Sequence, residues 1–147
     1  MQKVHLKWID NLRFFVNDES GHSLVIDTKK EVGGTETGFQ PVDLILVSLA
    51  GCMAFDMVSI LKKMKSELKH FSVSVEGERA TEHPKRYTKI LIKFKTNDEI
   101  KEADLQKVFE LSRDKYCSVF WTLQTPPEIN FAFEKKQNRG DVEKNEN

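Results

Sequence analysis

The feature that most constrains this chain is a long apolar segment that begins at Pro41. Proline is favoured in the first turn of a helix, and Asp43 nearby suits the positive end of the helix dipole. Apolar residues then recur with helical spacing. They are Val42, Ile45, Leu46, Leu49, Met53, Met57, Ile60, Leu61 and Met64. Hardly any face of this helix is polar before Leu61, so we expect it to be surrounded by protein.

The same segment does not predict a membrane span. Between Asp43 and Asp56 lie only twelve uncharged residues, whereas a helix needs about 20 to cross a bilayer. We therefore expect the buried helix of a soluble protein, which becomes amphipathic after Lys62 and ends near Lys69.

Strand patterns precede and follow this helix. The first thirty residues contain three short apolar runs separated by turn-forming residues, which predicts a three-stranded meander. A glycine-rich segment, residues 31–38, is predicted to be a mobile loop. Beyond the helix, alternation over residues 71–76 and 87–94 predicts a hairpin, with Pro84 in the connection.

The last third of the chain predicts one helix and one strand. Residues 98–116 have a helical stripe, which residues 117–124 either continue or replace by a new turn, and residues 128–134 alternate as a half-buried strand. The element order is thus β-β-β-α-β-β-α-β, an α+β fold. Residues 1–134 are predicted to form a single domain, and the polar residues 135–147 a disordered tail.

A helix buried on every side needs more cover than one small sheet provides. We infer that a second copy of the chain supplies it, as an intertwined homodimer. Gly51 supports close packing of another helix, because glycine inside a helix costs about 1 kcal/mol relative to alanine.

Charge and histidine content argue against several classes of partner. Lysine plus arginine and aspartate plus glutamate number 23 each, so no net positive field attracts nucleic acid or a membrane surface. The N-terminus has neither a signal nor a transit pattern, which predicts a cytoplasmic location. The four histidines are scattered without metal-ligand spacing, so no metal or bound cofactor is expected.

Two cysteines are the candidate chemical groups. Cys52 lies inside the apolar helix on one stripe with Ser48 and Asp56, and Cys117 follows a segment that contains Arg113. Free cysteines are often inert and buried, and this interpretation competes with a redox pair. A reactive thiolate would need a lysine or arginine brought beside it by the fold.

Two motifs around these cysteines resemble the OsmC/Ohr family, which comprises osmotically inducible protein C and organic hydroperoxide resistance protein. The first is FQPVDLILVSLAGC at residues 39–52, followed by DMVSILKK at residues 56–63, and the second is SRDKYCSV at residues 112–119. The resemblance covers about residues 1–134, and the sequence around both cysteines is most similar to that of the YhfA-like branch.

The resemblance implies an intertwined dimer with two active sites at its interface. It also implies thiol peroxidase chemistry on organic hydroperoxides, with Cys52 attacking, Cys117 resolving and an external dithiol or lipoyl group as reductant. Characterised members have a glutamate after the motif's proline, where this chain has Val42; Asp43 and Asp56 are the possible acidic replacements. Arg13 is the only arginine before Cys52 and the candidate activating cation.

Two other functions compete with the peroxidase. The same fold could bind a small hydrophobic or thiol-bearing ligand without turnover, an interpretation motivated by Val42. It could also serve as a redox sensor that signals through a partner when the cysteine pair is oxidised.

Overall fold

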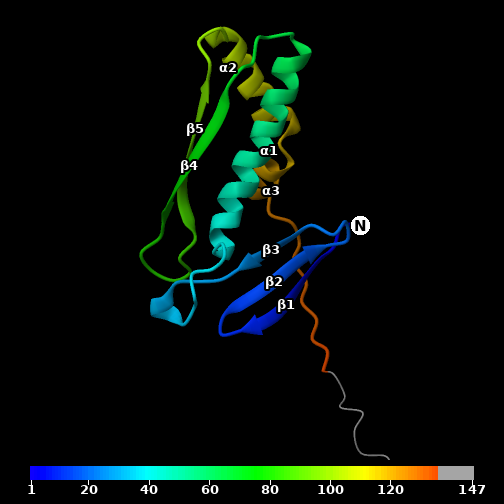
Figure 1. Cartoon of the computed structure of the whole chain (residues 1–147), viewed down its shortest axis with the longest axis vertical. Helices are drawn as coiled ribbons and strands as arrows, with labels where there is room; N and C mark the ends of the chain where they lie inside the picture. Colours follow the sequence, from blue (N-terminus) through cyan, green and yellow to red (C-terminus); the bar gives the residue numbers. More distant parts are fainter. Residues whose placement is uncertain (136–147) are drawn as a thin grey trace, which may run out of the picture.

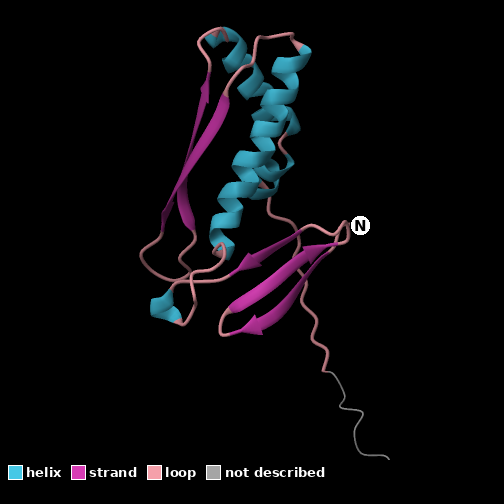
Figure 2. Cartoon of the chain, viewed as in Figure 1, coloured by secondary structure: helices cyan, strands magenta, loops and turns pink. Residues whose placement is uncertain are grey.

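The computed structural model of the chain describes residues 1–135. A three-stranded sheet lies across one end of a long helix, a two-stranded hairpin runs along one side of that helix, and two shorter helices lie against another side (Figure 1; Figure 2). The mixed content and the predicted meander, long helix and hairpin are confirmed, but the long helix ends at Lys63 rather than near Lys69, where Lys65 turns the backbone with a φ of 57°. Of the predicted disordered tail, residues 136–147 lie outside the described residues.

The N-terminal sheet is an antiparallel meander. It consists of β1 (Val4–Asp10), β2 (Arg13–Asp18) and β3 (Ser23–Ile26), in that spatial order. Its register places Leu6 opposite Val16, and Val16 opposite Leu24. The tight turn between the first two strands includes Asn11, whose φ of 40° is tolerated better by asparagine than by most residues.

The long helix α1 (Pro41–Lys63) packs against the rest of the body through one face. This face contains Leu49, Ala50, Met53, Met57 and Leu61, all buried. It contacts the hairpin of β4 (Phe71–Arg79) and β5 (Tyr87–Thr96), and also α2 (Glu102–Leu111). The inward side chains Ile90, Ile92 and Phe94 of β5 complete the apolar contact.

The helix predicted over residues 98–116 is shorter and divided. Helix α2 begins at Glu102 and ends at Leu111, and the wider π-helical segment η2 (Ser112–Tyr116) follows it. A separate helix, α3 (Ser118–Gln124), then begins after Cys117. Single π-helical turns are often found at functional sites, and this one sets the position of Cys117.

The prediction of a final strand at residues 128–134 is wrong for the single chain. The segment is extended but pairs with no strand of the described chain. Its alternating apolar side chains Ile129, Phe131 and Phe133 are 67%, 82% and 96% exposed. A strand needs a neighbouring edge as well as an alternating sequence, and residues 1–135 of the single chain place none beside this segment.

The opposite face of α1 is also left uncovered, contrary to the expectation that protein surrounds the helix. Val47 and Phe55 on this face are 49% and 81% exposed. Apart from its chain neighbours and the backbone of its own helix, no atom of residues 1–135 lies within 4 Å of the place where a Cβ atom on Gly51 would be, so these residues do not provide the close packing expected there.

In length and composition, the 23-residue α1 matches a membrane-crossing helix, with a mean hydropathy of 2.2 over an 18-residue window. This differs from the expectation drawn from its twelve-residue uncharged run. A core helix of a soluble protein passes the same test, and the buried stripe from Leu49 to Leu61 is the feature that such a helix has.

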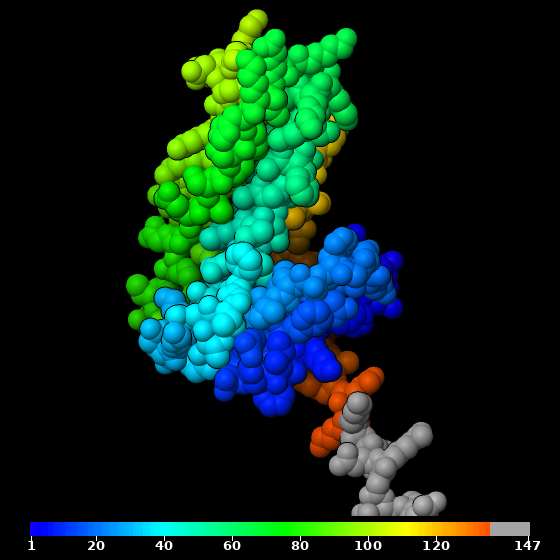
Figure 3. All heavy atoms as spheres, viewed as in Figure 1, coloured from blue at the N-terminus to red at the C-terminus, as the bar shows by residue number. Residues whose placement is uncertain are grey.

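The N-terminal sheet contacts chiefly its own strands. The extensive contacts of α1 are with β4, α2, η2 and α3 rather than with β1–β3. The space-filling view shows the sheet at the lower end of the molecule, beside the start of α1 (Figure 3). Three side chains of β1, Val4, Leu6 and Trp8, are more than half exposed, so this sheet also presents an apolar surface without cover.

Candidate active site

Cys52 is a half-buried free thiol at the border between the buried and uncovered faces of α1. Its Sγ atom lies 3.9 Å from the hydroxyl oxygen of Ser118, the first residue of α3. Ser48, one helical turn before Cys52, and Ser118 both line a groove of about 300 Å³ between α1 and α3. We call this the α1/α3 groove. Its remaining walls are Pro41, Leu44, Ile45, Val119, Thr122 and Leu123.

Cys117 is a completely buried free thiol at the junction of η2 and α3. Its backbone N–H donates to the carbonyl oxygen of Ser112 at 2.8 Å, and its Sγ atom accepts from the N–H of Phe120 at 3.4 Å. It therefore caps α3 with its sulfur. Leu49 and Met53 enclose it, and the side chain of Cys52 packs against the same cluster.

The surroundings of Cys117 favour the protonated thiol. Burial is the main cause that raises its pKa to about 11, and the neighbouring thiol of Cys52 and the charge of Asp56 raise it further. The N–H of Phe120 opposes them. The fold thus brings the two predicted cysteines together, and at neutral pH Cys117 is a thiol rather than a thiolate.

The two candidate acids have different positions. Asp56 lies beside the thiols, where it accepts a hydrogen bond of 3.0 Å from the buried hydroxyl of Ser112. Asp43 is nine residues before Cys52, about 13 Å along the helix axis. It accepts a hydrogen bond of 3.3 Å from Tyr87, whose pKa is raised by burial and then by Asp43. Of these two acids, therefore, Asp56 is the one whose charge affects the cysteine pair in the single chain.

Arg13 is held in a network of the N-terminal sheet. Its Nε and Nη2 atoms donate to both carboxylate oxygens of Asp10, at 3.1 and 2.5 Å, and its Nη1 atom donates to Thr37 at 3.4 Å. No hydrogen bond joins it to Cys52 within residues 1–135. The single chain does not bring the predicted activating cation to the thiol.

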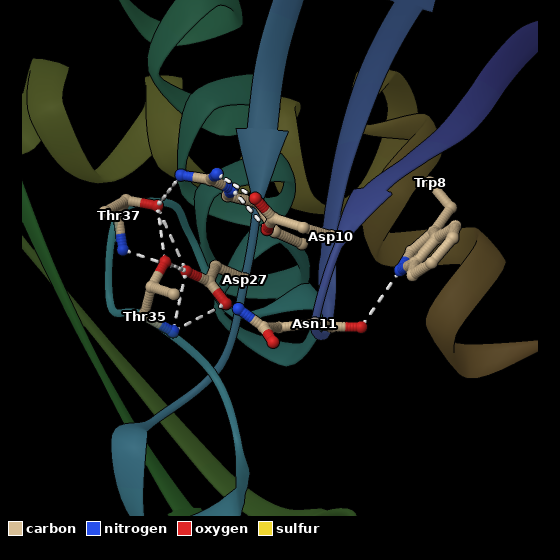
Figure 4. Close-up of polar contacts among 7 residues, drawn as sticks. Trp8, Asp10, Asn11, Asp27, Thr35 and Thr37 are labelled. Atoms are coloured by element: carbon tan, nitrogen blue, oxygen red, sulfur yellow. Dashed lines mark hydrogen bonds and ion pairs between the residues drawn. The ribbon is translucent and has the colours of Figure 1, made fainter.

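Asp27 organises the other end of this network, as Figure 4 shows. Its carboxylate is 1% exposed and accepts hydrogen bonds from the backbone N–H groups of Thr28, Thr35 and Thr37. The hydroxyls of Thr35 and Thr37 also donate to it. Mainly because of the Thr35 hydroxyl and the N–H of Thr37, the pKa of Asp27 lies well below its usual range.

The loop at residues 31–38, which was predicted to be mobile, has a defined conformation because Thr35 and Thr37 are hydrogen-bonded to Asp27. A Cβ atom on Gly34 would lie 2.0 Å from the carbonyl oxygen of Thr28, and one on Gly38 would lie 2.4 Å from that of Val25. Glycine is needed at both places because the backbone approaches so closely, not because the loop must flex.

Several site residues were not predicted from the sequence. Ser118 could have been noticed, since it directly follows Cys117. Asp10 lies three residues before Arg13 across the β1–β2 turn, a spacing that allows an ion pair. Nothing in the sequence indicates that Asp27 and Thr37 meet, because their contact depends on the path of the loop between them.

The comparisons with known proteins agree with this architecture. The family described as OsmC-like protein matches residues 34–132. The protein YhfA of Escherichia coli K12 is 30% identical over 133 residues, which cover 90% of this chain and 96% of YhfA.

Solved structures give the same fold. A hypothetical protein from Aquifex aeolicus has a TM-score of 0.73 and 30% identity, covering 84% of this chain and 87% of its own. An organic hydroperoxide resistance protein OsmC from Legionella pneumophila has a TM-score of 0.64 at 13% identity, covering 85% and 90%, a likeness of fold alone. Both cysteine motifs lie inside the matched region, and the chain belongs to the OsmC-like protein family.

Proposed function

We propose that this chain is a thiol-dependent peroxidase that reduces organic hydroperoxides with Cys52 and Cys117. The observation that carries the proposal is the packing of Cys52 against the cluster that contains Cys117, two residues that are 65 positions apart in the sequence. Membership of the family supports it, since the Legionella pneumophila structure is described as an organic hydroperoxide resistance protein.

The two cysteines have different roles in this reaction. The Cys52 thiolate attacks the distal oxygen of the hydroperoxide, the O–O bond breaks, and the alkoxide leaves as alcohol after taking a proton. Cys52 is then a sulfenic acid. The Cys117 sulfur attacks the Cys52 sulfur, a disulfide forms, and water leaves with the Cys117 proton. An external dithiol, such as a lipoyl group, or a small thiol restores both thiols and is itself oxidised, so no bound cofactor is required.

The high pKa of Cys117 fits the resolving role. A thiol that stays protonated does not compete with Cys52 for the peroxide. When Cys52 becomes a sulfenic acid, the hydroxide that leaves its sulfur can take the Cys117 proton.

The active form in this proposal is a cytoplasmic homodimer. Three uncovered apolar surfaces of the single chain support it: the Val47 and Phe55 face of α1, the outer face of β1, and the extended segment at residues 128–134. A second copy that covers these surfaces gives the unpaired segment a sheet edge. Such an assembly can also bring Arg13 of one copy to Cys52 of the other, which the single chain does not do.

Mass spectrometry tests the chemistry directly. One equivalent of cumene hydroperoxide should make the reduced protein lighter by two hydrogens, because the disulfide replaces two thiols. Cys52→Ser should abolish this change, and Cys117→Ser should stop the reaction at a trappable sulfenic acid. A wild-type protein that remains a dithiol under excess hydroperoxide would contradict the proposal.

A second candidate function is binding of a small hydrophobic or thiol-bearing ligand, or redox sensing, without turnover. The absence of a hydrogen bond from a lysine or arginine to Cys52 within residues 1–135 favours it, as does Val42 at the position of the family glutamate. Continuous peroxide consumption with dithiothreitol separates the two functions. A rate equal to the background supports binding or sensing, whereas sustained turnover supports the peroxidase.

A further inference from the structure

A second and larger cavity adjoins the α1/α3 groove, with which it shares the lining residues Ile45 and Leu123. It has a volume of about 590 Å³ and is bounded by α1, β5 and the region from α2 to α3. Neither cysteine lines it. Cavities that bind small organic molecules commonly have volumes of about 300–1,000 Å³.

The floor of this cavity is apolar. It is formed by Ile45, Leu49, Met53, Ile90, Ile92 and Phe120. Two of these residues, Leu49 and Met53, also enclose Cys117, so they form the wall between the cavity and the buried thiol. An alkyl chain is the kind of group that such a floor can remove from water.

The charged residues that line the cavity all have one sign. They are Arg86, Lys89 and Arg113, and no aspartate or glutamate is among the lining residues. Because the whole chain has as many acidic as basic residues, this local excess of positive charge is not a reflection of composition. It selects for an anionic head group.

The two arginines retain donors for such a group. The guanidinium of Arg113 lies 5.3 Å from the ring centre of Phe109, another lining residue, and bonds Asp114 through Nε and Nη2 only. Its Nη1 hydrogens remain. Within residues 1–135, the side chain of Arg86 forms no ion pair with a carboxylate, and its one hydrogen bond is from Nη1 to the carbonyl oxygen of Tyr87 at 3.3 Å.

We propose that this cavity binds a single-chain amphiphile with an anionic head, the chain against the α1 and β5 floor and the carboxylate or phosphate at Arg86 and Arg113. The site is separate from the cysteine pair and does not depend on peroxidase activity. A planar carboxylate can take two parallel hydrogen bonds from one arginine, and the chain gains free energy with each buried methylene.

Isothermal titration calorimetry of the full chain with dodecanoate, below its micelle concentration, tests the proposal. We expect saturable binding of one ligand per chain. Decanoate should bind about fifteenfold more weakly, the effect of two methylene groups. Dodecyltrimethylammonium, with the same chain and a cationic head, should bind at least about tenfold more weakly than dodecanoate. Dodecyl phosphate distinguishes a phosphate from a carboxylate head.

Variants show where the ligand binds. Arg86→Gln combined with Arg113→Gln should weaken dodecanoate binding at least about tenfold, while Arg79→Gln, on the same hairpin but outside the lining, should not. Cys52→Ser should bind as the wild type does, which separates this site from the proposed peroxidase. Val32→Glu reports on adventitious binding to an exposed apolar residue outside the cavity and leaves the proposed dimer intact.

Three results would overturn the inference. They are the absence of saturable binding, equal binding of the anionic and cationic amphiphiles, and loss of binding in Val32→Glu with retention in the double arginine variant.

Discussion

The hydroxyl oxygen of Ser118 lies 3.9 Å from the sulfur of Cys52, and this contact joins residues 66 positions apart. It exists because η2 ends α2 early and allows α3 to begin directly after Cys117. A hydroxyl at this place can donate to a sulfur that carries negative charge. In the proposed peroxidase reaction, Ser118 is therefore a positioning residue for Cys52.

Loss of that hydroxyl should slow the first chemical step. Ser118→Ala removes one weak hydrogen bond, worth about 1 kcal/mol, so we expect the rate of Cys52 oxidation by cumene hydroperoxide to fall about fivefold. Stopped-flow measurement of the single oxidation step gives this rate. Thr122→Val, a change at another lining residue of the α1/α3 groove, is the control; an equal effect there would assign the loss to the groove in general.

The raised pKa of Cys117 predicts slow alkylation. In Cys52→Ser, iodoacetamide should label Cys117 slowly at pH 8 and faster as the pH rises towards about 11, because burial, the main cause of the shift, is retained. Adding Asp56→Asn should move this rise to lower pH, since the Asp56 charge raises the pKa. Labelling of the folded protein at pH 8 as fast as that of the denatured chain would contradict the assignment.

The buried carboxylate of Asp27 should make stability depend on pH in the acid range. The folded-state pKa is depressed, so the stabilisation is present above the unfolded pKa of about 3.9 and is lost as the pH falls through the folded value. We expect Asp27→Asn to lower Tm at pH 7 by at least about 5 °C and to flatten the decline below about pH 4. Asp98→Asn, at an exposed position, should change neither.

The Asp10 and Arg13 pair predicts how the proposed activation depends on geometry. Arg13→Lys keeps the charge but loses the bidentate ion pair with Asp10. We therefore expect the oxidation of Cys52 to slow at least about tenfold. Asp10→Asn should slow it less, because Thr37 still accepts from Arg13. Arg79→Lys is the matched control. Unchanged oxidation in Arg13→Lys would remove Arg13 from the mechanism without affecting the roles of the cysteines.

The uncovered face of α1 predicts the effect of a charge on assembly. Phe55, 81% exposed in the single chain, would be buried in the proposed homodimer, and Phe55→Glu should yield monomers by light scattering at concentrations where the wild type is dimeric. Val32→Glu places the same charge at another exposed apolar residue, away from α1, and should leave the dimer intact. A monomeric wild type would contradict the homodimer.

The predictions that the sequence supported were those that depend on local periodicity. The spacing of apolar residues from Val42 to Met64 specified α1, and alternation specified the meander and the hairpin, because side-chain direction repeats with the backbone geometry of each element. The same alternation predicted a strand at residues 128–134 that the single chain does not form. Alternation says which side chains share a face, but it says nothing about which edge is available to pair.

The sequence by itself determined the family, the two thiols and the order of elements from the meander to the hairpin. The tertiary structure decided what surrounds each thiol: Ser118 beside Cys52, Asp56 and Ser112 beside Cys117, and Arg13 tied to Asp10 rather than to either cysteine. The physical reason is that these contacts join elements far apart in the chain. They depend on where η2 ends α2 and on how the Asp27-bound loop turns into α1, and neither leaves a periodic signal in the residues concerned.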